Sequence, residues 1–417
     1  MSSILSHLSI LLIADHFPPS FAPRMGFLTK NLAMKGHTVT VVASLHHRDM
    51  NSFGHLEGYA TTVKDVKVFL PSWKRLGVLL SNLFGYVVSG RKLWTMSDDR
   101  AYRLAIDEVK NNSFDCILVS TSNFFPLMAA SRVAEETGLP IFVDIRDIYE
   151  QAPSFWPMNG ISGRLRKAQI PVRNLILSKA RAVTTVSKWN VDMLRPFNPN
   201  TLLIYNGYDS TMFRPTEPVP TTHLTISFTG TISTPTGSIE ARNPELLFKT
   251  LRVMISEGID VLGKIRVLFY TDAKSRDMVL PLVAKYGLQE CVELHPWVSA
   301  LEVSRILPES NILLLLADNR KLKGVLTTKF FEYMATQRPI ICLPCSGGVI
   351  GEILDEAGAG VCFDDVQPLK DYLSWSLKTW TENSCVLPNA KSRLDYIRSF
   401  TRQYQATQFE QLFHNMI

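Results

Sequence analysis

The chain has 417 residues, of which 46% are apolar and 20% are charged, and its formal net charge is +6. These values are typical of a globular protein and exclude a disordered, collagen-like or disulfide-rich chain. The length favours two large domains. No apolar run reaches the ~20 residues that a membrane-spanning helix needs.

The positive charge is concentrated in the first half of the chain. Residues 1–215 contain 24 Lys and Arg against 16 Asp and Glu, whereas the remainder contains 20 against 22. An excess of basic residues in the first half favours an anionic partner there, such as a phosphate, a membrane surface or a nucleic acid. The first residues lack the basic start and the small-residue cleavage site of a secretory signal, so we expect a cytoplasmic protein.

Short apolar strands alternate with amphipathic helices along both halves of the sequence. In the first half we predict strands at 8–14, 38–43, 116–120, 141–143 and 182–186, and helices at 27–34, 101–110 and 129–137. In the second half we predict strands at 224–228, 265–270, 291–294, 312–316 and 340–343, and helices at 245–256, 277–286, 301–307, 328–336 and 349–354. This alternation predicts an α/β protein with two doubly wound, Rossmann-like domains.

A proline-rich segment at 214–221 marks the expected domain boundary. We therefore predict an N-terminal domain at 1–214 and a C-terminal domain at 222–391. The tail at 392–417 has helical spacing and is expected to form a long helix that packs back on the N-terminal domain. Ligands of such sheets bind beyond the carboxyl ends of the strands, so we expect the site in a cleft between the two domains.

The segment 326–362 carries the most informative chemistry. Lys329 and Glu332 lie three residues apart and share one face of the predicted helix. A carboxylate can accept hydrogen bonds from both ribose hydroxyls, and an ammonium can neutralise a phosphate. Gly347 and Gly348 follow a strand and open a helix, an arrangement suited to a phosphate. The alternative is a surface ion pair followed by an ordinary strand–helix turn.

The motifs KFFEYMATQRPI (329–340) and SGGVIGEIL (346–354) resemble the donor site of glycosyltransferase family 4 and its bacterial surface-polysaccharide relatives. Three other regions resemble the same family in the same order along the chain. They are the segment from 15 to 42, the motifs ARAVTTVSKWN (180–190) and LIYNGYDSTMFRP (203–215), and SFTG (227–230). The resemblance spans nearly the whole chain.

This resemblance implies the GT-B fold, with the two domains facing across a cleft, and a nucleotide diphosphate sugar as donor. Glu332 would bind the ribose. The other expected donor-site residues are Lys329, Gly230, Thr231, Gly347, Gly348 and Lys323. The resemblance further implies metal-independent transfer with retention of configuration to a lipid-linked saccharide, in the assembly of capsule, O-antigen or exopolysaccharide.

Two departures from the family pattern concern the transferred sugar and the diphosphate. Gly324 stands where many members carry a second glutamate, and Thr231 follows Gly230 where many carry an arginine. Lys321, Lys323, Lys329 or Arg242 would then substitute in contacting the diphosphate. A sugar-nucleotide 2-epimerase of the same fold and a non-catalytic partner subunit therefore remain alternatives.

The motif DIRD at 144–147 directly follows a predicted strand and resembles an element of the polysaccharide subgroup. We predict Asp144 and Asp147 as catalytic residues that orient an acceptor hydroxyl or stabilise positive charge in the transition state. Arg24 and Arg146 are expected on the acceptor side. The alternative is that Asp144 caps a turn and pairs with Arg146.

The sequence does not predict a metal site. Cys342 and Cys345 form a C-x-x-C pair, but no second pair or histidine cluster accompanies them, so we interpret both as small apolar residues at a strand end. Asp98-Asp99 and Asp364-Asp365 lack the spacing of the D-x-D motif of metal-dependent transferases.

Two segments predict peripheral attachment to the inner face of the cytoplasmic membrane. Aromatic and basic residues flank the short apolar run 76–90, which suits a helix lying in an anionic membrane surface. Residues 151–191 contain seven basic residues and no acidic one. The alternatives are a core helix and a solvated basic face, and nucleic acid is the partner least compatible with the transferase motifs.

Overall fold

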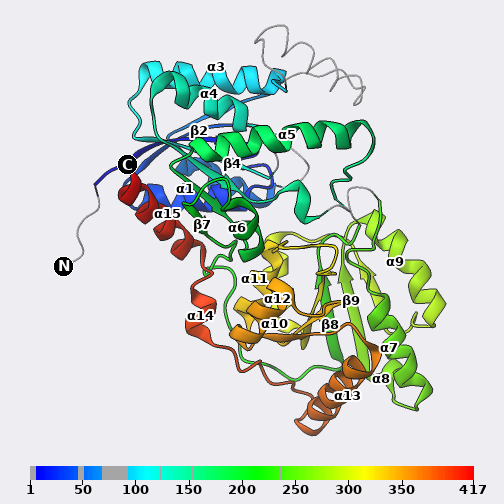
Figure 1. Ribbon diagram of the computed structural model, residues 1–417. Coiled ribbons are helices and arrows are strands. Elements are labelled where there is room, and N and C mark those ends of the chain that lie inside the picture. The colour runs from blue at the N-terminus through cyan, green and yellow to red at the C-terminus, as the bar shows by residue number, and fades with distance from the viewer. Residues whose placement is uncertain (1–5, 46–50, 68–92, 123, 153–154, 234–236) are drawn as a thin grey trace. The chain divides into compact units, whose positions relative to one another are not determined.

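The computed structural model describes residues 6–45, 51–67, 93–122, 124–152, 155–233 and 237–417. The chain divides into two compact units (Figure 1). The first unit comprises Met1–Tyr149, Pro157–Tyr205 and Arg402–Ile417, and the second comprises Glu150–Trp156 and Asn206–Thr401. The division after Tyr205 precedes the expected proline-rich boundary, and residues 392–401 belong to the second unit.

The first unit is built on a parallel sheet with strand order β3-β2-β1-β4-β5-β6-β7. Its strands are β1 (Ser9–Ala14), β2 (Thr38–Ala43), β3 (Thr62–Asp65), β4 (Cys116–Thr121), β5 (Ile141–Ile145), β6 (Ala182–Thr185) and β7 (Thr201–Leu203). Its helices are α1 (Pro23–Met34), η1 (Asn51–Tyr59), α3 (Met96–Asn111), α4 (Leu127–Thr137), α5 (Gly160–Lys179), α6 (Lys188–Leu194) and α15 (Arg402–Met416).

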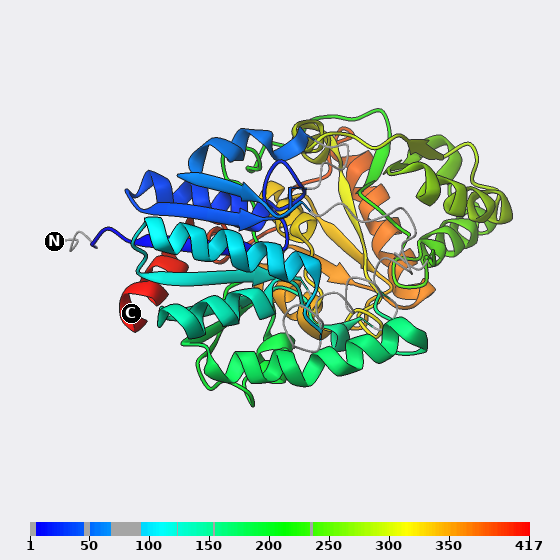
Figure 2. The same cartoon turned by 90° about the horizontal axis from the view of Figure 1, so that it is seen from above.

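Both faces of this sheet are buried, which explains the continuous apolar runs of its central strands. Leu11 and Ile13 pack with α3, α4 and α5 on one face. Ile10 and Leu12 point to the opposite face and pack with α1 and α15. Figure 2 shows α15, in red, among the blue, cyan and green elements of this unit. The last helix of the chain thus completes the core that the first strand begins.

The second unit repeats the same architecture, with strand order β10-β9-β8-β11-β12-β13 and parallel pairing. Its strands are β8 (Leu224–Thr229), β9 (Ile265–Tyr270), β10 (Val292–His295), β11 (Ile312–Leu316), β12 (Ile340–Leu343) and β13 (Gly360–Cys362). Its helices are α7 (Glu245–Ser256), α8 (Val261–Lys264), α9 (Ala273–Tyr286), α10 (Ala300–Glu309), α11 (Thr328–Thr336), α12 (Gly348–Ala357), α13 (Val366–Glu382) and α14 (Leu394–Arg398), and the short η2 (Tyr149–Gln151) starts in the first unit.

In each unit the strand order reverses direction beside the first strand, between β1 and β4 and between β8 and β11. This is the Rossmann order, and the carboxyl ends of the strands at the reversal are where such sheets bind ligands. The prediction of two doubly wound α/β domains is confirmed.

The tail differs from the expected single long helix. α14 and α15 are separate helices, interrupted at residues 399–401. α14 contacts α11 and α12 of the second unit, whereas α15 packs on α1 of the first. Among the helices that the structure describes, none combines the length and the apolarity that a membrane crossing requires.

A buried polar cluster fastens α15 to the first unit. Glu410 accepts hydrogen bonds from Lys35, at the end of α1, and from Nε2 of His37 at 3.0 Å. The backbone N–H of Leu8 donates to Nδ1 of the same imidazole at 3.1 Å, so the ring proton resides on Nε2. Burial alone would raise the pKa of Glu410, but the hydrogen bonds from Lys35 and His37 outweigh it and lower that pKa.

We expect the Glu410→Gln variant to lose stability in a pH-dependent way. A carboxyl whose pKa is lowered by folding stabilises the protein above its unfolded pKa, near 4.5, and this contribution disappears as the pH falls through the folded pKa. Urea unfolding should therefore show a deficit at pH 7 that shrinks below about pH 4.5. Glu135→Gln, which removes an exposed pair with Lys179, should change little. A deficit that grew on acidification would contradict this assignment.

Candidate functional site

Arg24 and Asp144 form a fully buried ion pair in the first unit. Arg24 lies in the first turn of α1, and its Nε and Nη2 donate to the two carboxylate oxygens of Asp144 at 3.1 and 2.8 Å. Its remaining hydrogen bonds go to the carbonyl oxygens of Ile204 at 3.0 Å and Tyr205 at 2.8 Å, beyond the end of β7. The Phe409 ring of α15 lies 5.3 Å from the guanidinium carbon. One side chain thereby connects α1, β5, the end of β7 and α15.

Strand register supplies the other partners of Asp144. The residue lies within β5, paired with Ser120 of β4 on one side and Thr184 of β6 on the other. Both hydroxyls donate to its carboxylate, at 2.9 and 2.8 Å. Burial alone would raise the pKa of Asp144, but Arg24 and the Thr184 hydroxyl outweigh it and lower that pKa. Asp144 is therefore an ionised, internally paired carboxylate.

A second ion pair lies at the carboxyl ends of β1, β4 and β5. Asp15, directly after β1, accepts a hydrogen bond from Arg146 and further ones from the backbone N–H and the hydroxyl of Ser122, both at 2.8 Å. Burial alone would lower the pKa of Arg146, but the carboxylates of Asp15, Asp144 and Asp147 outweigh it and raise that pKa. Asp15 and Arg146 thus mark the position where the strand order of this sheet reverses.

The structure distinguishes the predicted residues of the first unit by their exposure. Arg24 and Asp144 are buried and bound to protein groups, so Asp144 does not present its carboxylate to a substrate, and its expected direct catalytic role does not fit this geometry. Arg146 and Asp147 are half-buried at the end of β5. Sequence reasoning missed Asp15, although an acidic residue directly after the first buried strand was a usable signal.

In the second unit, the turn after β8 is held from two helices. Ser275, in the first turn of α9, accepts hydrogen bonds from the backbone N–H groups of Ile232 and Ser233 at 3.0 and 3.2 Å. From the other side, Lys329 of α11 donates to the Thr229 carbonyl at 2.7 Å. The loop containing Gly230 and Thr231 therefore has a fixed conformation.

Gly230 permits this close approach of Lys329. Its φ is +112°, and a Cβ atom at this position would lie 2.5 Å from the Lys329 Nζ. Burial, reinforced by the positive charge of Arg242, lowers the pKa of Lys329 well below its ordinary value, although Glu332 acts in the opposite direction. An adjacent cavity of ≈ 10 Å³ has room for about one water molecule. The side-chain nitrogen of Lys329 is thus hydrogen-bonded to a protein carbonyl beside this small cavity.

The Ser346–Gly348 turn, after β12, is the second glycine turn of the predicted donor site. Asn319, beyond the end of β11, donates from Nδ2 to the Gly347 carbonyl at 2.8 Å. Gly347 and Gly348 have φ values of +110° and +67°, a conformation that residues with a Cβ rarely adopt. This turn positions the N-terminus of α12 at the carboxyl edge of the sheet.

The remaining predicted donor residues lie near the same edge of the sheet. Glu332 is half-buried on α11 and close enough to Lys329 for their charges to interact. Lys323 is exposed in the loop between β11 and α11. Gly324 has a φ of +69° and is buried, so a glutamate would be strained there.

Comparison with known proteins identifies the fold. No family model matches the chain, and no curated protein matches it. HepE from Anabaena, in complex with UDP and glucose, superposes with a TM-score of 0.63 at 12% identity, over 97% of this chain and 99% of that chain. A glycosyltransferase from Rickettsia africae superposes with a TM-score of 0.61 at 12% identity, over 99% of both chains.

An epimerase has the same fold. UDP-GlcNAc 2-epimerase from Neisseria meningitidis, bound to UDP-GlcNAc, superposes with a TM-score of 0.56 at 11% identity, over 97% of this chain and 99% of that chain. The chain thus has the GT-B fold, with two Rossmann-like units. Because both enzyme classes occur among the similar structures, the fold alone does not choose between them.

We expect the Asp144→Asn variant to destabilise the protein by about 3–5 kcal/mol, because it leaves the Arg24 guanidinium buried without its counter-ion. Asp147→Asn, three residues along the same segment, is the matched control and should change stability by less than about 1 kcal/mol. Chemical denaturation of both variants measures the difference. Equal stability of the two variants would show that the buried pair does not constrain the fold.

Proposed function

We propose that this protein is a metal-independent, retaining glycosyltransferase that moves a sugar from a nucleotide diphosphate sugar to a hydroxyl of a lipid-linked saccharide, in the assembly of a surface polysaccharide. The observation that carries the proposal is the KFFEYMATQRPI motif on α11. Its Lys329 contacts the turn after β8, and its Glu332 lies one helical turn further along. This edge of the sheet is where a Rossmann-like unit binds a nucleotide.

We assign Glu332 to the ribose of the donor. A carboxylate accepts from both ribose hydroxyls, and α11 positions it at the carboxyl edge of the sheet. The Gly347–Gly348 turn brings the backbone N–H groups and the dipole of α12 toward the same edge, which favours a diphosphate. Lys323, which is exposed in the adjoining loop, is the cation that we assign to the phosphates. Lys329 then serves mainly to hold the Gly230 turn in place.

The acceptor side of the reaction is assigned to the first unit. Asp147 and Arg146 are half-buried at the end of β5, shortly after Asp144, which the buried pair with Arg24 holds in place. Asp147 would orient the acceptor hydroxyl or stabilise positive charge on the sugar in the transition state. The leaving diphosphate would take the acceptor proton, so the proposal requires no strong protein base. Arg24 and Asp144 are positioning residues in this scheme.

A sugar-nucleotide 2-epimerase is the second candidate, favoured by the likeness to the Neisseria enzyme. Mass spectrometry of the purified protein identifies bound nucleotide sugars, and a screen of labelled donors follows the label. Release of label from the nucleotide to water or to an acceptor supports transfer. Label that remains in a nucleotide sugar of altered configuration establishes the epimerase instead. Binding without turnover of any donor would indicate a non-catalytic subunit.

We expect Glu332→Ala to weaken nucleotide binding by about 1–3 kcal/mol, because two ribose hydroxyls lose their acceptor. Calorimetry with the nucleotide identified by mass spectrometry measures this. Glu356→Ala, on the exposed face of α12, is the control and should bind like the parent protein. Unchanged affinity of the Glu332 variant would refute the ribose assignment.

We expect Asp147→Asn to lower kcat while donor affinity stays at the parent value, because the side chain is assigned to the acceptor and the transition state. Steady-state kinetics and calorimetry on the same preparation separate the two effects. Parent-like turnover would show that Asp147 has a structural role.

The membrane proposal rests on α5, since the apolar run 76–90 and its flanking Trp73, Lys74, Arg75, Arg91 and Lys92 lie outside the described residues. One exposed face of α5 carries Ile161, Arg164, Lys167 and Leu175, with Ile161 73% and Leu175 58% exposed. Apolar and basic side chains on one helix face suit an anionic membrane surface. Arg173 is buried, and so is Trp94, which therefore does not belong to a membrane-facing aromatic group.

We expect sedimentation with anionic vesicles at low salt and release at high salt. Each basic residue near the surface contributes roughly 1 kcal/mol, so Arg164→Gln with Lys167→Gln should reduce binding at least about tenfold. The control neutralises two exposed residues of α7, Lys249 and Arg252, and should bind normally. Equal binding of the two double variants would exclude α5 from the membrane contact.

A further inference from the structure

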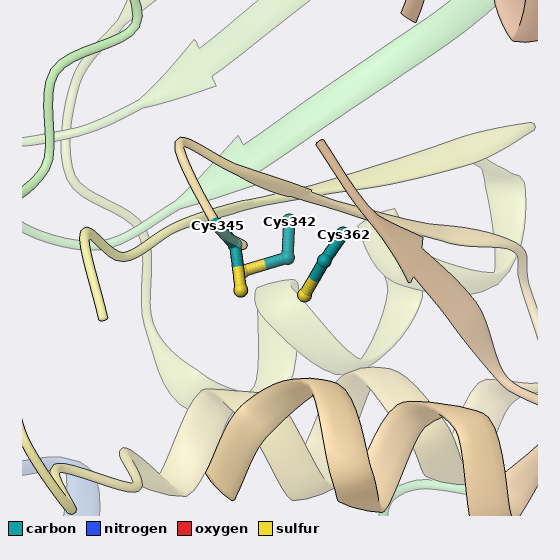
Figure 3. A group of neighbouring side chains, drawn as sticks. All are labelled: Cys342, Cys345 and Cys362. Atoms are coloured by element: carbon teal, nitrogen blue, oxygen red, sulfur yellow. The ribbon is translucent and has the colours of Figure 1, made fainter. Parts of the chain in front are cut away.

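Three cysteines converge beside the Ser346–Gly348 turn. Cys342 is in β12, Cys345 precedes the turn, and Cys362 ends β13. The register of the sheet pairs Cys342 directly with Cys362, and the sulfur atoms of all three lie within 4.8 Å of one another. Figure 3 shows the three side chains directed to the same side of the strands. The C-x-x-C pair thus has a third member that sequence spacing does not reveal.

The surroundings of the cluster suit a bound ion. Cys342 and Cys345 are buried, whereas Cys362, in the edge strand β13, is partly exposed. Tetrahedral zinc with thiolate ligands requires sulfur–sulfur separations of about 3.8 Å. The observed upper bound of 4.8 Å would need to contract by no more than about 1 Å to meet this. Soft thiolates select thiophilic cations over magnesium or calcium.

The second group of metal-type ligands in the described residues is already accounted for. It comprises His37, Glu410 and His414. Both ring nitrogens of His37 are hydrogen-bonded, to Leu8 and to Glu410, and Glu410 is also bound to Lys35. This group fastens α15 to α1.

We propose that Cys342, Cys345 and Cys362 form a binding site for a thiophilic divalent metal ion of the zinc type. The three thiols become thiolates on binding, so one ion enters and up to three protons leave to solvent. Three protein ligands leave the fourth position for water or another small ligand. The inference is independent of the proposed transferase activity, because it rests on the sulfur positions alone.

Binding at this site would alter the adjoining turn. The Cys345 thiol donates to the Gly347 carbonyl at 3.4 Å, and the backbone N–H of Cys345 donates to the Phe363 carbonyl at 2.8 Å. A metal ion would replace the first of these bonds, while the second would continue to fix the chain. The ion would therefore act on the conformation of Gly347 without opening the sheet.

The test is metal binding by the full-length protein. Protein purified under reducing conditions without chelator is analysed for zinc. Bound metal is then removed from the protein. A titration with Zn²⁺ measures proton release, and a titration with Cd²⁺ measures the thiolate-to-metal charge-transfer absorption. We expect one ion per chain, release of protons, and a rise in the thermal unfolding temperature. If neither Zn²⁺ nor Cd²⁺ binds, the proposal is overturned.

Serine variants locate the site. Cys362→Ser, at the partly exposed sheet edge, should reduce Cd²⁺ affinity at least tenfold and abolish the metal-dependent rise in unfolding temperature. Cys385→Ser, a partly exposed cysteine of the same unit outside the cluster, should bind like the parent. A Cys362 variant that binds normally overturns the proposal, as does alkylation showing that Cys342 and Cys345 form a disulfide in the isolated protein. The metal-free unfolding temperature of each variant confirms that it folds.

Discussion

The buried pair of Arg24 and Asp144 is the interaction on which the first unit depends. Four elements that are distant in sequence, α1, β5, the end of β7 and α15, are joined through one guanidinium group. A buried ion pair is weak evidence for stability, because desolvation offsets much of the attraction. The pair instead fixes the geometry of the unit, since a planar guanidinium can donate hydrogen bonds to a carboxylate and two carbonyls in one arrangement only. The carboxyl end of β5 is thereby fixed, together with the half-buried Arg146 and Asp147.

The sequence did not reveal this arrangement, because β5 is two residues longer than the strand that its apolar run predicts. The apolar pattern predicts a strand at 141–143, which leaves Asp144 in a loop. β5 continues to Ile145, so Asp144 is flanked by Ser120 and Thr184 on neighbouring strands. A loop carboxylate would be open to ligands, whereas a strand carboxylate between two hydroxyls is internal. Periodicity and alternation predict the long buried strands and most helices, but the pairing of Asp144 depends on register, which no local pattern encodes.

A short edge strand explains why the sequence did not reveal the third cysteine of the cluster. β13 has only three residues, one of them a glycine, and is too short to show a periodic pattern in the sequence. This strand places Cys362 beside the C-x-x-C pair. The helix that begins the KFFEYMATQRPI motif was predicted correctly, because its apolar residues recur at helical spacing. Even there, the role of Lys329 changed, since its contact with the Thr229 carbonyl depends on the missing Cβ of Gly230. That contact joins residues a hundred positions apart and has no counterpart in the sequence pattern.

The path of the chain also determines the order in which the protein can fold during its synthesis. α15 packs against α1 and covers the face of the sheet formed by Ile10 and Leu12. A ribosome completes the entire second unit before it reaches Arg402, so until then the part of this apolar face that α15 covers is exposed, and, of the described helices, only α1 packs on the face. Folding of the second unit is not delayed in this way, because its sequence is nearly continuous. The first unit to be translated is thus the last to mature, and chaperone binding is expected to concentrate on that uncovered face.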